Sequence, residues 1–294
     1  MNYQKPGLQG LLLIVLSLGV TIVTVLIWQL LSPWIAVTLH YSSSEWLDNI
    51  NYLKGLQLLT SVSMFLMPPV LLAFILKQPV ALTLYFHRIK KPLLWIVVFC
   101  SMIVAQPFIN WLGDWNAKLI LPAWLSGLEH WMKAMEQESD QIVNRFLTVH
   151  SLKGLLFNII LIAIVPAFAE EFFFRGTVQR LFAQKMNIHL SIWITAAIFS
   201  AVHVEFYGFI PRLLLGAYLG YLLAWSGSIW IPVLAHFANN FIGVFVGYWM
   251  ANHVGYDYLD HIGSTQYGWM SVAGICLFIP MVWFIYKHRN TVIL

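Results

Sequence analysis

Charged residues are scarce in this sequence of 294 residues: they make up 10% of it, whereas hydrophobic residues make up 60%. A soluble domain has about 25% charged residues, so a chain with this little charge could not cover its surface in water. The composition therefore excludes an ordinary soluble domain and predicts an all-α, polytopic membrane helix bundle. The formal net charge of +4 is small, and we expect no nucleic-acid partner.

Cysteine is equally scarce. Cys100 and Cys276 both lie in apolar runs, which argues against a disulfide framework and gives no redox signal. The first apolar run, residues 11–31, is too long for a signal peptide and lacks a small-residue cleavage site. We therefore expect this run to remain in the mature protein as a membrane span.

Long apolar runs, by contrast, are abundant and predict about eight transmembrane helices. The runs are 11–31, 56–76, 92–112, 155–175, 190–206, 209–225, 229–249 and 268–286. The fifth and sixth are shorter than the roughly 20 residues that a span needs. No repeat, linker or low-complexity segment interrupts the series, so residues 1–294 are predicted to form a single membrane domain.

The distribution of Lys and Arg predicts an orientation with both termini inside. Basic residues collect in the short cytoplasmic loops of membrane proteins. With the N-terminus inside, ten of the sixteen Lys and Arg residues fall in inner segments: Lys5, Lys77, Arg88, Lys90, Lys91, Arg175, Arg180, Lys185, Lys287 and Arg289. Ten of the twelve acidic residues fall in outer segments, and the other two are Glu170 and Glu171.

The longest loop, about residues 113–154, contains an amphipathic stretch on the predicted outer side. Apolar residues recur there at helical spacing, namely Trp124, Leu125, Leu128, Trp131, Met132 and Met135. This stripe is typical of a helix that lies in the membrane interface with its indoles at headgroup depth. We interpret the helix as an anchor that closes the bundle; a lid or substrate-docking surface is the alternative.

A few ionisable residues interrupt the predicted spans. Glu205 and Arg212 are set aside, because they fall at outer span ends where they can reach water. The others are Glu170, Glu171, Arg175, His203 and His236. A charge at the bilayer centre costs at least about 2.5 kcal/mol, so such groups face the bundle interior and have partners.

Helical geometry separates the two adjacent glutamates. Glu171 and Arg175 are four residues apart with the acid first, which favours an ion pair on one helix face. Glu170 points about 100° away and is therefore free to meet groups from other helices. We interpret Glu171 and Arg175 as a structural pair and Glu170 as the reactive acid.

Three predicted helices can bring their polar groups to one depth. The same four-residue spacing aligns Phe199 with His203 and His236 with Asn240. At about 1.5 Å of rise per residue, Glu170, the two histidines and Asn240 all fall within the hydrocarbon core at comparable levels. The sequence therefore permits these four groups to converge.

Such a cluster suits several functions. As an acyl hydrolase, a carboxylate and a histidine would hold and deprotonate water while a second histidine and an amide stabilise the oxyanion. As a metal site, two histidines and one glutamate match many catalytic zinc sites. As a transporter, the groups would form a proton or ion relay. The simplest alternative is a satisfied polar network that fixes helix register.

Signatures of several other membrane proteases are absent, because the chain contains no His-Glu-x-x-His, Gly-x-Ser-Gly or Gly-x-Gly-Asp. It does contain EEFFFR at 170–175, FSAVH at 199–203 and HFANN at 236–240. In this order and spacing they resemble the three motifs of the CPBP family, the CAAX-protease and bacteriocin-processing proteins. These intramembrane proteases are similar to type II CAAX prenyl endopeptidases. The resemblance covers a predicted catalytic core of about residues 155–245.

The resemblance implies a role for each motif residue. Glu170 would activate water, His203 would help to hold it, and His236 with Asn240 would stabilise the oxyanion; Glu171, Arg175 and Phe199 would support the site. The family is described both as metal-free glutamate proteases and as metalloproteases, so a zinc ion on Glu170, His203 and His236 stays open. Some relatives act as immunity or scaffold proteins, which leaves a catalytically silent role as the alternative.

The resemblance also implies where the protein works and what it meets. It predicts an integral, multi-pass protein of the bacterial cytoplasmic (inner) membrane, in contact with lipid and acting on a peptide or protein substrate. Gly216 and Gly220 lie four residues apart in an apolar run, a pattern that lets two helices approach closely. We expect this face to pack inside the bundle, with homodimerisation through it as the alternative.

Overall fold

The computed structural model describes residues 5–89, 91–259 and 262–289, so Lys90, one of the basic residues counted above, lies outside the described residues. Across these ranges the chain forms helices joined by turns and loops, with no strand, which confirms the predicted all-α class. The α-helices are α1 Pro6–Thr38, α2 Ser43–Leu47, α3 Ile50–Ser61, α4 Met67–Ile75, α5 Val80–Thr83, α6 Pro92–Ala117, α7 Ser126–Leu147, α8 Leu152–Asn158, α9 Val165–Phe173, α10 Arg180–Ala183, α11 Ile188–Ala201, α12 Phe209–Ser226, α13 Trp230–Asn252 and α14 Gly268–Lys287.

Short helical segments of other geometry complete the fold. Three π-helical segments, Val62–Leu66, Ile159–Ile164 and Phe174–Gln179, continue the neighbouring α-helices without a break. Three 3₁₀ turns occur at Ala123–Leu125, Asp257–Leu259 and Thr265–Tyr267. Because of the π-helical segments, α3 and α4 form one helix over Ile50–Ile75, and α8 to α10 form one over Leu152–Ala183.

Seven helices in the described part of the chain are long and apolar enough to cross a membrane. The remaining predicted span, the fifth run at 190–206, corresponds to the shorter helix α11, which has 14 residues and ends at Ala201. Fourteen residues extend about 21 Å, less than the roughly 30 Å hydrocarbon core. The fifth predicted run, already shorter than a usual span, therefore forms a short helix that ends before His203.

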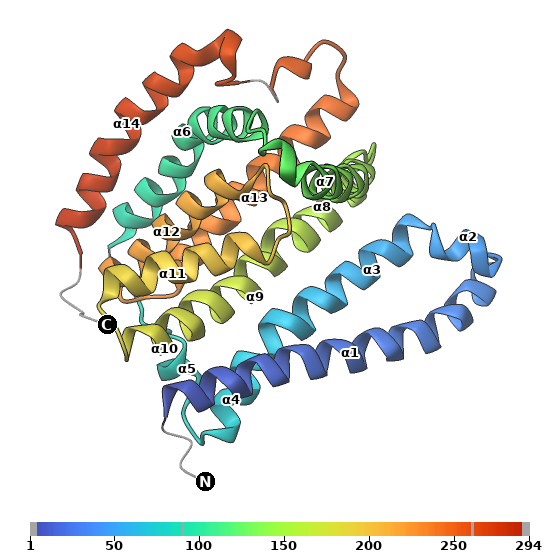
Figure 1. Cartoon of the computed structure of the whole chain (residues 1–294), viewed down its shortest axis with the longest axis horizontal. Helices are drawn as coiled ribbons and strands as arrows, with labels where there is room; N and C mark the ends of the chain where they lie inside the picture. Colours follow the sequence, from blue (N-terminus) through green and yellow to red (C-terminus); the bar gives the residue numbers. More distant parts are fainter. Residues whose placement is uncertain (1–4, 90, 260–261, 290–294) are drawn as a thin grey trace.

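The centre of the bundle is α13, which packs against α6, α9 and α12. Leu94 and Val98 of α6, Leu219 and Leu222 of α12 and Ile231 of α13 belong to the largest apolar cluster. In Figure 1, α1 and α3 form a long pair at one edge and α14 lies at the other. The residues that carry the three sequence motifs are thus held in the middle of the molecule.

Local signals explain several helix ends. The side chains of Ser151 and Asn187 accept hydrogen bonds from the first turns of α8 and α11, which satisfies backbone donors that have no partner inside the helix. Gly227 follows α12 with φ 66°, a left-handed conformation that glycine adopts without steric cost. The tight turn at Gly227 allows α12 and α13 to pack as neighbours.

The small-residue face of α12 is used inside the bundle, as expected. A Cβ atom on Gly216 would lie 3.1 Å from the Ala196 Cβ, and one on Gly220 would lie 2.8 Å from Ile192, so both glycines contact α11 closely. The same face bonds to the helix that carries the glutamates, because the Gly216 carbonyl accepts from Arg175 and the Gly220 carbonyl from Gln179. Homodimerisation of the protein remains a prediction.

Both described chain ends lie at one end of the bundle (Figure 1). Lys91, just before α6, donates a hydrogen bond to the carbonyl of His288, just after α14. This arrangement agrees with a chain whose two termini face the same side of a membrane. The assignment of that side to the cytoplasm remains a prediction from the charge pattern.

Candidate functional site

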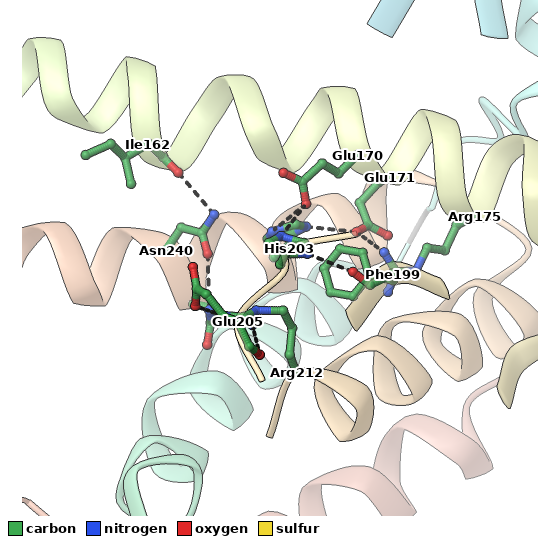
Figure 2. Close-up of polar contacts among 11 residues, drawn as sticks. Ile162, Glu170, Glu171, Arg175, Phe199, His203, Glu205, Arg212 and Asn240 are labelled. Carbon is green, nitrogen blue, oxygen red and sulfur yellow. Dashed lines mark hydrogen bonds and ion pairs between the residues drawn. The ribbon is translucent and has the colours of Figure 1, made fainter. Parts of the chain in front are cut away.

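Three elements bring the motif residues together. Glu170, Glu171 and Arg175 lie on the long helix Leu152–Ala183, where π-helical segments flank α9 on both sides. Phe199 lies near the end of α11, His203 follows it, and His236 and Asn240 lie on α13. Isolated π-helical turns occur frequently at functional sites because they reorient side chains on a helix face. Figure 2 shows the two glutamates extending from one helix toward the other motif residues.

Glu171 is the centre of a fully buried ion pair. Its Oε1 lies 2.6 Å from Arg175 Nη1, and both side chains have no solvent exposure. The pairing predicted from the four-residue spacing is therefore present in the structure. The same oxygen also lies 2.8 Å from His236 Nδ1, a contact that the sequence spacing did not reveal. Glu171 thus orients a residue of α13 as well as Arg175.

Glu170 faces both histidines. Its Oε2 lies 3.8 Å from His203 Nε2 and 3.8 Å from His236 Nε2. This oxygen is buried and has no hydrogen-bond partner among the described residues. The structure therefore brings Glu170, His203 and His236 together, with separations slightly larger than direct hydrogen bonds allow.

The Nδ1 atom of each histidine has a fixed partner, which determines that the other ring nitrogen, Nε2, faces Glu170. His203 Nδ1 lies 2.7 Å from the Phe199 carbonyl, which can only accept, so Nδ1 carries a proton. His236 Nδ1 lies against the Glu171 carboxylate in the same way. Each ring therefore presents Nε2 to Glu170.

Phe199 lies between the ion pair and the histidines. The Arg175 guanidinium carbon is 4.5 Å from the centre of its ring, a cation–π contact. The same ring makes edge contacts with His203 and His236, at centroid distances of 4.9 Å and 5.9 Å. Phe199 thus supports the site by packing against three of its polar members.

Asn240 is held by a carbonyl of the glutamate-bearing helix. Its Nδ2 donates to the Ile162 carbonyl at 3.0 Å, as Figure 2 shows. Ile162 precedes Pro166 by four residues, and proline has no N–H to donate to it. A side chain from a neighbouring helix thus satisfies the carbonyl that the proline leaves without its usual donor. Asn240 lies beside the cluster and keeps a second amide N–H.

The turn 202–208 carries His203 and also Glu205, which pairs with Arg212 of α12. Both side chains reach water, as expected, but only in part: they are 29% and 20% exposed and form an ion pair. Figure 2 places the pair beside His203 and Asn240. In the sequence, the only sign of this ion pair is that an acidic and a basic residue lie seven positions apart, on either side of a predicted loop.

Side chains from other elements hold this turn in place. Asn116 of α6 is buried and bonds to both the Phe206 carbonyl and the Ile210 N–H. Glu136 of α7 accepts from the Tyr207 N–H at 3.1 Å. Val204 has φ 56°, a conformation that is strained for a β-branched residue and persists where its surroundings impose it. The position of His203 is therefore imposed by α6 and α7.

The zinc alternative concerns Glu170, His203 and His236, whose facing atoms lie 3.8 Å apart. Among the described residues, no group of three or more His, Cys, Asp or Glu side chains is arranged to hold a metal ion. Glu170 and the two histidines come closest by composition. A zinc ion on Glu170, His203 and His236 remains a prediction.

Comparisons with known proteins point to one family. Residues 152–242, which include every motif residue, match the family model described as type II CAAX prenyl endopeptidase Rce1-like. YpbD of Bacillus subtilis (strain 168), described as uncharacterized, is 27% identical over 163 residues, which cover 54% of this chain and 78% of that protein. No solved structure matches. The resemblance predicted from the three motifs is confirmed by the family match.

Proposed function

We propose that this chain is an intramembrane endopeptidase in which Glu170 activates the water that hydrolyses a peptide bond. The observation that carries the proposal is the buried Glu170 Oε2, which has no hydrogen-bond partner among the described residues and faces two histidine Nε2 atoms at 3.8 Å. The match of residues 152–242 to a family of prenyl endopeptidases supports it.

The geometry around Glu170 suits a shared water molecule. An ionised carboxylate oxygen and a neutral histidine Nε2 both accept hydrogen bonds and cannot bond to each other. A water with two O–H groups can donate to Glu170 and to His203 at once. In the proposed reaction Glu170 removes one proton while the water oxygen bonds to the carbonyl carbon of the substrate.

His236 is proposed to stabilise the oxyanion that forms on the substrate carbonyl. Donation from Nε2 requires protons on both ring nitrogens, because Nδ1 already donates to the Glu171 carboxylate. The buried charges then balance, because Glu170 and Glu171 are offset by Arg175 and His236. Charge balance matters here because an uncompensated charge is costly in a low-dielectric bundle.

The remaining steps conserve protons. Glu170 passes its proton to the nitrogen of the leaving amine, the C–N bond breaks, and the oxyanion returns to a carbonyl in the new carboxyl terminus. Asn240 is proposed to donate its second N–H to the oxyanion, because its first is held by the Ile162 carbonyl. Glu171, Arg175 and Phe199 would position His236 and His203.

The proposed substrate is a peptide that reaches the site within the lipid environment. The seven long apolar helices make this an integral, multi-pass membrane protein, and residence in the bacterial cytoplasmic membrane is part of the proposal. The family description names CAAX prenyl endopeptidases, so a prenylated CAAX peptide is the first substrate to test. An unprenylated peptide of the same sequence tests whether the lipid matters.

The test is hydrolysis of an internally quenched farnesylated CAAX peptide by the purified full chain in detergent. Glu170→Gln keeps the shape of the side chain and removes the base, so the rate should fall by about 10²- to 10⁴-fold. Glu138→Gln is the matched control, because it makes the same change at an exposed position of α7. Its rate should equal that of the unmodified protein.

Three results would count against the proposal. Equal hydrolysis by the Glu170→Gln variant would remove Glu170 as the base. Absence of cleavage across prenylated and unprenylated peptides, together with a cellular phenotype that survives Glu170→Gln, would favour a catalytically silent scaffold or immunity role. Proton-coupled flux abolished by the same change would favour a transporter.

A further inference from the structure

A second polar site lies away from the motif residues, where α3 begins and α7 ends. A cleft of about 480 Å³ opens there. Its lining residues are Ile50, Lys54, Asn144, Arg145, Thr148 and Val149. Neither the three motifs nor the proposed protease reaction uses any of them.

Lys54 is a buried cation without an anionic partner. It is 5% exposed, and its Nζ donates to Asn158 Oδ1 at 2.8 Å. The rings of Phe146 and Phe157 lie 5.6 Å and 5.8 Å from Nζ. No carboxylate among the described residues lies within ion-pair distance of it. A buried charge is costly unless it is paired. An anion bound near Lys54 would therefore reduce the cost of burying its charge.

A second cation, Arg145, also lines the cleft. Arg145 is exposed on α7, and its Nη2 donates to the Asp48 carbonyl at 2.7 Å. An ammonium has three N–H donors and a guanidinium has five. One donor of each is used by the bonds named here, so several remain for a ligand in the cleft. The ligand that this pair of cations fits is an anion with several acceptor oxygens.

The position along the chain indicates where that anion comes from. Lys54 is the fifth residue of the membrane-spanning helix Ile50–Ile75, about 6 Å from its end. The cleft therefore opens at the level where lipid headgroups meet the hydrocarbon core. Its walls combine the two cations with the apolar side chains of Ile50 and Val149, which suits a phosphate attached to a glycerol and acyl chains.

We propose that this cleft binds the phosphate group of an anionic lipid headgroup between Lys54 and Arg145. The phosphate supplies the counter-charge that Lys54 lacks and links α3 to α7 through charge-assisted hydrogen bonds. Phosphate oxygens accept the remaining Lys54 and Arg145 donors, while the acyl chains continue along the apolar surface of α3. The occupant is thus a structural lipid and not a substrate of the protease site.

The experiment measures thermal unfolding of the detergent-purified full chain with added lipid. Phosphatidylglycerol should raise the midpoint, and phosphatidylcholine, which carries no net charge, should raise it much less. Arg145→Gln removes an exposed cation without opening the core, and the phosphatidylglycerol concentration that gives half the shift should rise by about tenfold or more. Lys54→Met should abolish the shift.

Lys118→Gln is the matched control, because it removes an exposed cation from the same predicted side of the membrane outside the cleft. It should retain the full shift. Inorganic phosphate that produces the shift in the unmodified protein and not in Arg145→Gln would support the phosphate site with a soluble source. An absent lipid shift, or an equal shift in Arg145→Gln and Lys118→Gln, would overturn the proposal, whether or not Lys54→Met folds.

Discussion

At the scale of single residues, the division of labour between the two adjacent glutamates follows from their partners. Glu171 Oε1 accepts from Arg175 Nη1 at 2.6 Å and from His236 Nδ1 at 2.8 Å. Glu170 makes no comparable bond and keeps 12% of its side chain exposed. One acid is thus committed to holding three helices in register, because Arg175 also donates to the Gly216 carbonyl. The other is free to react.

This division predicts different stabilities for the two alanine variants. Glu171→Ala leaves Arg175 buried and unpaired, and breaking a buried pair costs about 3 to 5 kcal/mol. Arg175→Ala should cost a similar amount, and the double variant should cost less than the sum, because the two residues share one interaction. Glu170→Ala should be much less destabilising. Unfolding free energies from denaturation in detergent micelles measure all four variants.

The opposite pattern would show that the structural and reactive acids have been exchanged. In that case Glu170→Ala would be the most destabilised variant, and the effects of Glu171→Ala and Arg175→Ala would be additive. Near-equal losses in both glutamate variants would also count against a division of roles.

At the scale of helices, the site depends on how closely α12 approaches its neighbours. Gly216 and Gly220 have no side chains, so their carbonyls are accessible to Arg175 Nη2 at 3.0 Å and to Gln179 Nε2 at 3.2 Å. These bonds satisfy polar groups that the helix Leu152–Ala183 buries. The close approach therefore supports the buried ion pair as well as the packing of α11.

A pair of glycine substitutions tests this close approach. A Cβ atom at Gly220 would lie 2.8 Å from both Gln179 Oε1 and Ile192 Cγ2, and both neighbours are buried. Gly220→Ala should therefore destabilise the protein by about 1 to 3 kcal/mol, as overpacking does. Gly113 of α6 has nothing within 4 Å of its added Cβ. Gly113→Ala should be neutral or stabilising by up to about 1 kcal/mol.

The measurement is the midpoint of thermal unfolding in one detergent for both variants. A fall for Gly220→Ala with no fall for Gly113→Ala is expected. Equal behaviour of the two variants would mean that α12 can move away from α11 without loss, and the close contact would then contribute little to stability.

At the scale of the whole molecule, α7 connects the amphipathic loop to the turn that holds His203. Glu136 accepts from the Tyr207 N–H, and the Trp131 ring lies 5.6 Å from the Phe206 ring. Trp124 and Trp131 are 80% and 50% exposed, as expected for a helix that rests in the membrane interface. The interfacial anchor and its alternative, a lid, both remain predictions.

The contact between α7 and the turn should depend on pH. Burial raises the pKa of the Glu136 carboxyl; the Tyr207 N–H and Arg212 lower this pKa, while Glu205 and Asp140 raise it further. The pKa of Asp140 is also raised, by burial and by Glu205. A carboxyl with a raised pKa in the folded state favours folding at low pH, because the folded state then binds more protons. This contribution is lost as pH rises through the folded pKa.

Hydrogen exchange measures the effect. Lowering the pH from about 7 to about 5 should increase the protection of amides in α7 and in the turn 202–208, after correction for intrinsic exchange rates. Glu136→Gln keeps an acceptor for the Tyr207 N–H and should reduce the pH dependence. Glu138→Gln, at an exposed position of the same helix, should retain it. Protection that rises with pH would contradict the assignment.

The sequence by itself determined the helical membrane class, seven of the eight predicted spans and the Glu171–Arg175 pair. These features depend on composition and on spacing along one helix, where local backbone geometry fixes which side chains share a face. It also identified Glu170, His203, His236 and Asn240, whose order and spacing match known motifs.

Only the tertiary structure decided which faces meet. His236 shares the Glu171 carboxylate across 65 residues of sequence, Asn240 bonds to the Ile162 carbonyl, and Lys54 is buried among rings of α7 and α8. The turn that follows α11 is likewise bonded to Asn116 and Glu136 from other helices. Contacts between distant segments produce no periodic pattern in the sequence. The apolar and polar pattern of one helix is compatible with many neighbouring helices, and only packing decides which neighbour it meets.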